Sequence, residues 1–161
     1  MICYVDTSAF IKRYAQEKNS DLVAEVFLIR TLTFITSIWT INETVAGLDK
    51  KVAKRQMSRE EADRAIQMLL SDSTGIVIDR CFPIMITHDL LFQSINLIIK
   101  HHISADDALH LASALMVGVD LLIAGDKRLI EAARTEGIES YNVEIDADAQ
   151  LLRRKLEGAS Q

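Results

Sequence analysis

The sequence is poor in several residue types whose abundance would mark particular classes of protein. Its 161 residues include two cysteines, one proline and 6% aromatic residues. Aliphatic side chains must therefore form most of the core. Cys3 and Cys81 stand apart in apolar, strand-like stretches, without the paired Cys or His spacing of a zinc site. We expect both to be buried free thiols in a reducing cytoplasm.

Long apolar runs are also missing. None approaches the roughly 20 residues that span a bilayer, because Asp120 and Pro83 interrupt the longest of them. The amino terminus enters an apolar stretch directly, without a basic region or a cleavage site, so we expect no secretion signal and a cytoplasmic protein. No repeat, linker or low-complexity segment divides the chain, and its 49% apolar content suits one domain with a substantial core.

The net charge of −5 argues against a large basic surface for nucleic acid. Net charge limits non-specific affinity rather than chemistry, however, so a nucleic-acid enzyme is still compatible with it.

Strand-like and helical patterns alternate along the whole chain. Short apolar stretches predict strands at 2–5, 33–36, 75–79, 121–124 and 141–145. Apolar spacing and capping residues predict helices at 10–16, 21–29, 38–55, 58–71, 87–100, 104–117 and 127–135, followed by a polar carboxyl-terminal helix. This alternation predicts an α/β fold with a mostly parallel central sheet.

Four acidic residues stand where apolar stretches end or helices begin: Asp6, Glu43, Asp107 and Asp126. In an open parallel sheet these points converge on one edge, outside the carboxyl ends of the strands. Clustered carboxylates repel one another unless a cation lies between them. The sequence therefore predicts a site for a hard cation such as Mg²⁺ or Mn²⁺.

Each acid also has a purely structural interpretation. Asp6 and Asp126 can cap the helices that follow them, and Asp107 lies three residues after Ser104, as in a capping box. Glu43 can be a lone solvated side chain. Small residues at Ala46 and Gly47, on the face of Glu43, instead leave room for a ligand or another backbone.

Four motifs, in order, resemble those of PIN-domain nucleases. They are Tyr-Val-Asp-Thr-Ser-Ala-Phe-Ile-Lys, Ile-Asn-Glu-Thr-Val-Ala-Gly-Leu, Ser-Ala-Asp-Asp-Ala-Leu-His-Leu-Ala-Ser-Ala and Leu-Ile-Ala-Gly-Asp-Lys-Arg-Leu. The resemblance covers roughly residues 2–144. It implies a PIN-like three-layer α/β/α domain over residues 1–145, with residues 146–161 as a carboxyl-terminal helix and tail of the same domain.

The resemblance also implies an activity: hydrolysis of RNA by an Mg²⁺- or Mn²⁺-dependent endoribonuclease. The family's acids, as catalytic residues and metal ligands, fall on Asp6, Glu43, Asp107 and Asp126, and its small hydroxyl residue falls on Ser8. Small proteins of this kind are most similar to VapC toxins of toxin–antitoxin pairs. An antitoxin partner and a homodimer are therefore expected.

One position departs from the family pattern. Ala124 stands where the family commonly has Thr or Ser, two positions before the fourth acid, so a hydroxyl that could orient water or substrate is missing.

Other polar residues complete the predicted site. Thr7 and Ser8 supply hydroxyl groups, and Arg13 and Arg128 are candidates to contact RNA phosphates, although both also suit solvated helix faces. We expect a structural or surface role for His110 rather than a catalytic one. We expect Trp39 to belong to the core or an interface rather than to a base-stacking surface.

Two other functions compete with the ribonuclease. A metal-dependent phosphatase of the haloacid-dehalogenase type would need a second Asp two residues after Asp6, where Ser8 stands. A non-catalytic PIN-like protein that binds RNA or a partner is favoured only by Ala124.

Helices 38–55 and 58–71 are predicted to form a hairpin with more apolar residues than one sheet face needs. We expect part of this apolar stripe to accept an amphipathic partner helix. The stripe comprises Ile41, Val45, Leu48, Val52, Ile66, Leu69 and Leu70.

Overall fold

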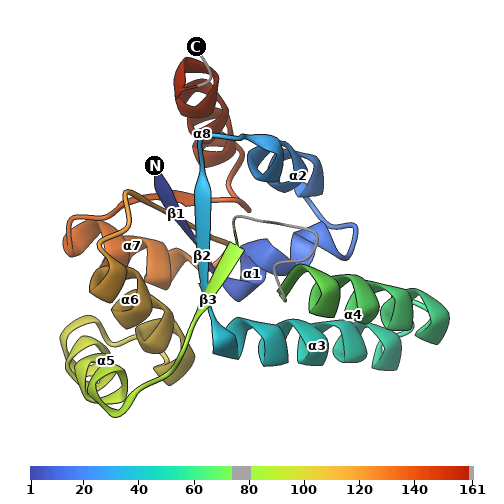
Figure 1. Cartoon of the computed structure of the whole chain (residues 1–161), viewed down its shortest axis with the longest axis horizontal. Coiled ribbons are helices and arrows are strands. Elements are labelled where there is room, and N and C mark those ends of the chain that lie inside the picture. Colours follow the sequence, from blue (N-terminus) through green and yellow to red (C-terminus); the bar gives the residue numbers. More distant parts are fainter. Residues whose placement is uncertain (74–80, 160–161) are drawn as a thin grey trace.

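A five-stranded parallel sheet forms the centre of the protein in a computed structural model that describes residues 1–73 and 81–159 (Figure 1). Its strands are β1 (Ile2–Val5), β2 (Thr33–Ser37), β3 (Cys81–Ile84), β4 (Leu121–Ala124) and β5 (Glu139–Asn142). The order is β3-β2-β1-β4-β5, and every neighbouring pair is parallel. All carboxyl ends therefore meet at one edge, and the strand order reverses between β1 and β4, where such sheets bind ligands.

Helices cover both faces of this sheet. They are α1 (Thr7–Phe10), the 3₁₀ helix η1 (Ile11–Arg13), α2 (Ser20–Leu28), α3 (Ile38–Ala53), α4 (Arg59–Ser73), α5 (His88–His101), α6 (Ala105–Val117), α7 (Lys127–Thr135) and α8 (Asp146–Ala159). Helices α5, α6 and α7 share one face, and α1, α2 and α8 share the other (Figure 1). The predicted three-layer α/β/α architecture is confirmed.

Alternate residues of the central strands supply the two cores. Cys3 and Val5 of β1 pack into the core with α2 and α8, whereas Tyr4 packs into the core with α6 and α7. In β4, Ile123 and Leu122 divide in the same way. A strand buried on both faces must be apolar throughout, which explains why these strands appear in the sequence as unbroken apolar runs.

Most predicted elements are confirmed to within a few residues, and two differ. The first helix is predicted at 10–16 but begins at Thr7, and it gives way after Phe10 to the short 3₁₀ helix. The last strand is predicted at 141–145 but spans Glu139–Asn142. The capping box is confirmed, since Glu61 accepts a hydrogen bond from the Ser58 backbone N–H (2.8 Å) and donates its own to the Ser58 hydroxyl (3.2 Å).

The strand predicted at 75–79 lies outside the described residues. The third strand observed is β3, which contains Pro83. Because β3 lies at the edge of the sheet, a residue without a backbone N–H is tolerated there.

Two further expectations concern thiols and membranes. Cys3 and Cys81 are both free and buried, as predicted. Within residues 1–73 and 81–159, no helix combines the length and the apolar character needed to cross a bilayer.

Candidate active site

Helices that begin at the carboxyl edge of the sheet position the predicted acids. Asp6 follows β1 and caps α1, and Asp126 follows β4 and caps α7. Asp107 lies in the first turn of α6, and Glu43 lies in the second turn of α3. Asp6 and Asp126 therefore both cap helices, as the structural interpretation predicts. A helix-capping role does not exclude a role in the site. In a parallel α/β fold, helix amino termini and a ligand site share the same edge.

His110 joins two of these acids. Its Nε2 lies 2.8 Å from Glu43 Oε2 and 3.3 Å from Asp6 Oδ1, and its Nδ1 lies 2.9 Å from the Tyr4 hydroxyl. Only 1% of the residue is exposed. Of the two expected roles for His110, structural or surface, the surface one is thus wrong, and the buried imidazole contacts two of the predicted acids. The available signal was its position, one helical turn after Asp107 in an otherwise apolar stretch.

Electrostatics favour the protonated form of this imidazole. Burial lowers the pKa of His110, but the nearby carboxylates of Asp6, Glu43 and Asp107 outweigh burial, so its pKa lies above the ordinary value. The site therefore already attracts one cationic group of the protein itself.

Two hydroxyl groups hold the carboxylates in place. Thr7 Oγ1 donates a hydrogen bond to Glu43 Oε2 (2.5 Å), and both the backbone N–H and the hydroxyl of Ser8 donate to Asp6 Oδ2. Ser8 Oγ in turn accepts a hydrogen bond from the backbone of Gly125 (2.6 Å). A Cβ atom at Gly125 would lie only 3.2 Å from the Ser8 side chain, so glycine allows this close approach.

Asp107 is the acid whose protonation the site disturbs most clearly. Burial, together with the charges of Asp126, Asp6 and Asp106, raises its pKa to about 6 despite a hydrogen bond from Ser104. That bond joins Ser104 Oγ to Asp107 Oδ2 at 2.6 Å. The predicted pairing of Ser104 with Asp107 thus exists alongside the electrostatic coupling to the other acids.

Asp126 lies at the exposed rim of the site. Its Oδ1 accepts hydrogen bonds from the backbones of Arg128 (2.7 Å) and Leu129 (3.1 Å). Its charge still contributes to the raised pKa of Asp107. Asp120 lies at the opposite end of β4 and accepts a hydrogen bond from the Ile2 backbone (2.7 Å), so it faces away from the site, as predicted.

The residue types of the site suit a hard divalent cation, but their side chains are not arranged as a coordination shell. Carboxylates predominate, and burial together with the neighbouring negative charges raises the pKa of Asp107. Among the described residues, however, no three His, Cys, Asp or Glu side chains are arranged to hold a metal ion. Glu43 and Asp6 face His110, and Asp126 faces its own helix, so the acids have adjacent positions without forming a coordination shell.

The predicted arginines and Ala124 have distinct positions. Arg13 Nε is paired with Asp72 Oδ2 at 2.9 Å and its guanidinium lies over the Phe27 ring, so it is not brought to the carboxylates. Arg128 is exposed in the first turn of α7, beside Asp126. Ala124 is fully buried at the end of β4.

Comparisons with known proteins agree with this fold. The family model of the PIN domain matches residues 3–135. Solved structures with a similar fold include VapC20 of Mycobacterium tuberculosis, described as a toxin that cleaves the sarcin-ricin loop (20% identity, TM-score 0.63, 81% of this chain and 94% of that one). Others are PAE2754 of Pyrobaculum aerophilum (18%, 0.62, 98% and 99%) and VapBC2 of Rickettsia felis, bound to a fragment of promoter DNA (19%, 0.61, 88% and 98%). No curated protein sequence matches the chain.

Proposed function

We propose, on the premise that this chain belongs to the PIN-domain family, that it is an endoribonuclease and the toxin of a toxin–antitoxin pair. The observation that carries the proposal is the pairing of Asp6 and Glu43 with the buried His110, with Asp107 near enough to help raise the pKa of this imidazole. The residues proposed to hold Mg²⁺ or Mn²⁺ are Asp6, Glu43, Asp107 and Asp126. When bound, such an ion would lower the pKa of a water molecule and offset charge that develops on the phosphate.

The protein's own residues would do the remaining work. A water molecule attacks the phosphodiester in line and the leaving oxygen departs from phosphorus. One of the carboxylates of the site would accept the proton of that water, and Asp107, which lies close to the other acids, is the candidate. Thr7 and Ser8 hold Glu43 and Asp6 in orientation, and Ser8 also supplies a hydroxyl at the end of β4, beside the position where Ala124 lacks one.

The substrate backbone needs a cationic contact, and Arg128 is the better of the two predicted arginines. It lies beside Asp126 at the rim, whereas Arg13 already has Asp72 as its partner. Such a contact would position the RNA without reading its sequence.

Cleavage of a mixed-sequence RNA by the purified chain tests the proposal. We expect cleavage with Mn²⁺, none after removal of the metal with EDTA, and none with Asp6→Asn, a change that keeps the shape of the side chain but removes its charge. Glu17→Gln, which alters a carboxylate in a different cluster, is the matched control and should cleave normally. RNA binding without cleavage under all metal conditions would support the non-catalytic alternative. Release of phosphate from small phosphate esters, with RNA left intact, would support the phosphatase.

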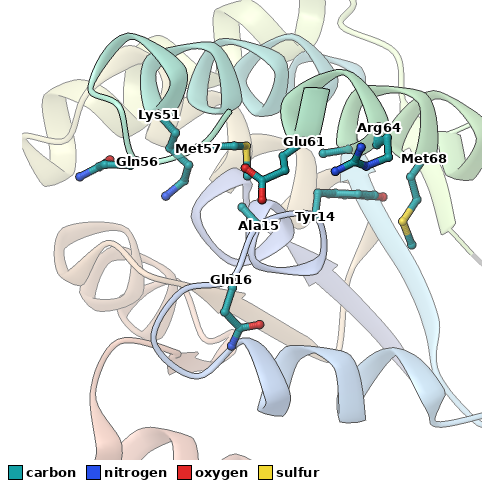
Figure 2. A pocket seen from close by; sticks show the side chains of 10 residues that line it. Tyr14, Ala15, Gln16, Lys51, Gln56, Met57, Glu61, Arg64 and Met68 are labelled. Carbon is teal, nitrogen blue, oxygen red and sulfur yellow. The ribbon is translucent and has the colours of Figure 1, made fainter. Parts of the chain in front are cut away.

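A groove beside the α3–α4 hairpin is the proposed docking surface for an antitoxin. It has a volume of about 670 Å³ and lies between the hairpin and the segment Tyr14–Gln16 (Figure 2). Side chains of the hairpin, including Met57 and Met68, point toward that segment (Figure 2). Glu61 and Arg64 add charges of both signs, as an amphipathic partner helix would require.

Among the described residues that line this groove, none belongs to the predicted apolar stripe, so the proposed partner would contact other side chains of the hairpin. Leu48 and Leu69 are fully buried within the chain, whereas Leu70 is 50% exposed. The remaining residues of the stripe, Ile41, Val45, Val52 and Ile66, are half-buried. Replacement of Met68 by Glu should weaken antitoxin binding, measured by calorimetry, without affecting RNA cleavage by the free toxin. Unchanged affinity would contradict this surface.

We also expect a homodimer, and the exposed apolar side of α5 is the surface proposed for it. Phe92 and Ile99 are 69% and 67% exposed there, and Ile95 is 47% exposed. Light scattering should give twice the mass of the chain, and Phe92→Glu should give the mass of one chain. A monomeric wild-type protein at tens of micromolar would contradict the dimer.

A further inference from the structure

A second cavity adjoins the acidic site. It has a volume of about 520 Å³, within the roughly 300–1,000 Å³ typical of small-molecule pockets. Its walls come from α3, from the start of α6, and from α5 with the segment before it. Trp39, Ile86, Leu91 and Leu109 supply apolar surface, and Glu43 and Asp106 supply carboxylates. Because Glu43 belongs to both the cavity and the acidic site, whatever occupies this cavity lies next to the proposed position of the reacting phosphate.

Trp39 is the distinctive wall of this cavity. It lies four residues before Glu43 on α3, so the two side chains share a helix face. Trp39 is 42% exposed, so of the two expected places, core or interface, the core is excluded. A large exposed aromatic ring beside a catalytic carboxylate offers a planar surface on which a nucleobase can stack.

The charges of the cavity indicate which part of an RNA would enter it. The described lining includes two carboxylates and neither Lys nor Arg, so it repels a phosphate. A neutral base can stack on Trp39 without this penalty. The carboxylate of Asp106, which forms part of the cavity lining, is a hydrogen-bond acceptor. Adenine, cytosine and guanine each present an amino group that can donate to it, whereas the edge of uracil places two carbonyl oxygens beside its single N–H.

We propose that this cavity receives the nucleobase next to the cleaved phosphate, stacked on Trp39, with an amino group of the base donating a hydrogen bond to Asp106. The proposal rests on the ribonuclease function, and it names the feature of the substrate that the protein reads. A base with an amino group (adenine, cytosine or guanine) would be preferred to uracil at this position.

Tryptophan fluorescence tests base binding independently of catalysis, because Trp39 is the only tryptophan of the chain. The probe is the cleavage-deficient Asp6→Asn protein, titrated with hexamers of adenylate, cytidylate or uridylate. We expect saturable quenching by the adenylate and cytidylate hexamers at concentrations about tenfold lower than by the uridylate hexamer. An active wild-type nuclease whose Asp6→Asn variant shows no quenching would overturn the cavity proposal and leave the proposed function intact. Quenching in a protein that never cleaves RNA would overturn the ribonuclease function and leave base binding by the cavity intact.

Substitutions separate stacking from overall folding. Binding is measured by the anisotropy of a fluorescein-labelled hexamer, all in the Asp6→Asn background. Trp39→Ala should weaken binding by about tenfold or more, and Trp39→Phe should restore most of the affinity because it keeps an aromatic face. Phe82→Ala removes another half-exposed aromatic residue, which does not line the cavity, and should have no effect. Equal losses for Trp39→Ala and Phe82→Ala would contradict a specific role for the indole.

Base preference tests the carboxylate. Asp106→Asn replaces an acceptor by a group that can also donate, so the roughly tenfold preference over uridylate should fall to within about threefold. An unchanged preference would contradict the assignment of Asp106.

A second copy of the chain could instead cover the cavity. In that case the Trp39 emission of the protein alone would shift toward the red on dilution, as the indole becomes exposed, and RNA would compete with dimer formation. A red shift of this kind, together with loss of quenching in the dimer, would overturn the proposal.

Discussion

Two clusters of carboxylates at the carboxyl edge of the sheet differ in whether the protein supplies enough cations of its own. In the lysine cluster, the fully buried Lys12 Nζ lies 3.2 Å from Glu17 Oε2 and 2.5 Å from Glu144 Oε1, and Lys51 also pairs with Glu17. Two lysines thus face two glutamates. In the acidic site, one imidazole faces Asp6 and Glu43, with Asp107 and Asp126 nearby.

The pKa values respond in opposite directions. Burial raises the pKa of Glu17, but Lys51 and Lys12 outweigh burial and lower it below the ordinary value. Burial and neighbouring carboxylates raise the pKa of Asp107 to about 6. In the lysine cluster, cations of the protein neutralise the carboxylates, so the cluster serves as a structural element. The acidic site has too few cations of its own, so it is suited to bind a cation from solution.

Removal of the buried cation from the lysine cluster should have the largest effect on stability. Lys12→Met removes the hydrogen bonds that the buried ammonium donates to Glu17 and to the Lys18 carbonyl, so we expect a loss of about 2 kcal/mol in the free energy of unfolding. Urea denaturation measures it. Lys127→Met removes a lysine from the exposed pair with Glu131 and should change nothing measurable. Equal free energies of unfolding for the two variants would show that the buried lysine cluster does not stabilise the fold.

The adjacent acids of the third motif should differ in activity. Loss of second-shell partners alone costs roughly 10–100-fold, so Asp107→Asn should reduce RNA cleavage by at least about a hundredfold. Asp106→Asn should reduce it less, to within about tenfold of the wild type, because successive helical residues point about 100° apart. Initial rates of cleavage measure both. The assignment within the pair would be wrong if Asp106→Asn were the more damaging change.

Addition of metal should stabilise only a protein with an intact acidic site. At tenfold excess over its dissociation constant, Mn²⁺ should add about 1.4 kcal/mol, which corresponds to a rise of about 3–6 °C in Tm. Differential scanning fluorimetry should show this rise for the wild type and for Glu17→Gln, but not for Asp6→Asn. A Tm unaffected by millimolar Mn²⁺ in all three proteins would contradict the metal site.

The smallest effect concerns pH in the absence of metal. The pKa of Asp107 is raised from 3.8 to about 6, so the stability associated with its protonated form is fully present below the lower value and is lost as the pH rises through the higher one. The free energy of unfolding of the wild type relative to Asp107→Asn should therefore fall between pH 4 and pH 6. The change should be modest, because solvent screens this half-exposed group. Urea denaturation at each pH would refute the expectation if the difference stayed constant.

Several parts of the site could be predicted because they depend on chain order. Strand ends, helix starts and parallel connections place Asp6, Asp107 and Asp126 at one edge, and local capping rules account for Ser58, Ser104 and Asp126. Strand β3 was harder to locate, because Pro83 argues against a strand unless its edge position is known.

The sequence by itself determined the alternation of strands and helices and the parallel sheet, and it indicated the candidate acids, since these follow from periodicity and from local rules along the chain. Only the tertiary structure decided which side chains meet. It placed His110 between Asp6 and Glu43, gave Arg13 to Asp72, and left Trp39 exposed in a cavity beside the acids. These contacts join residues dozens of positions apart, and they depend on how helices pack on the sheet and on which rotamers that packing allows. No local sequence pattern encodes contacts between residues so far apart in the chain. The balance of charge at the site is therefore set only when the chain folds.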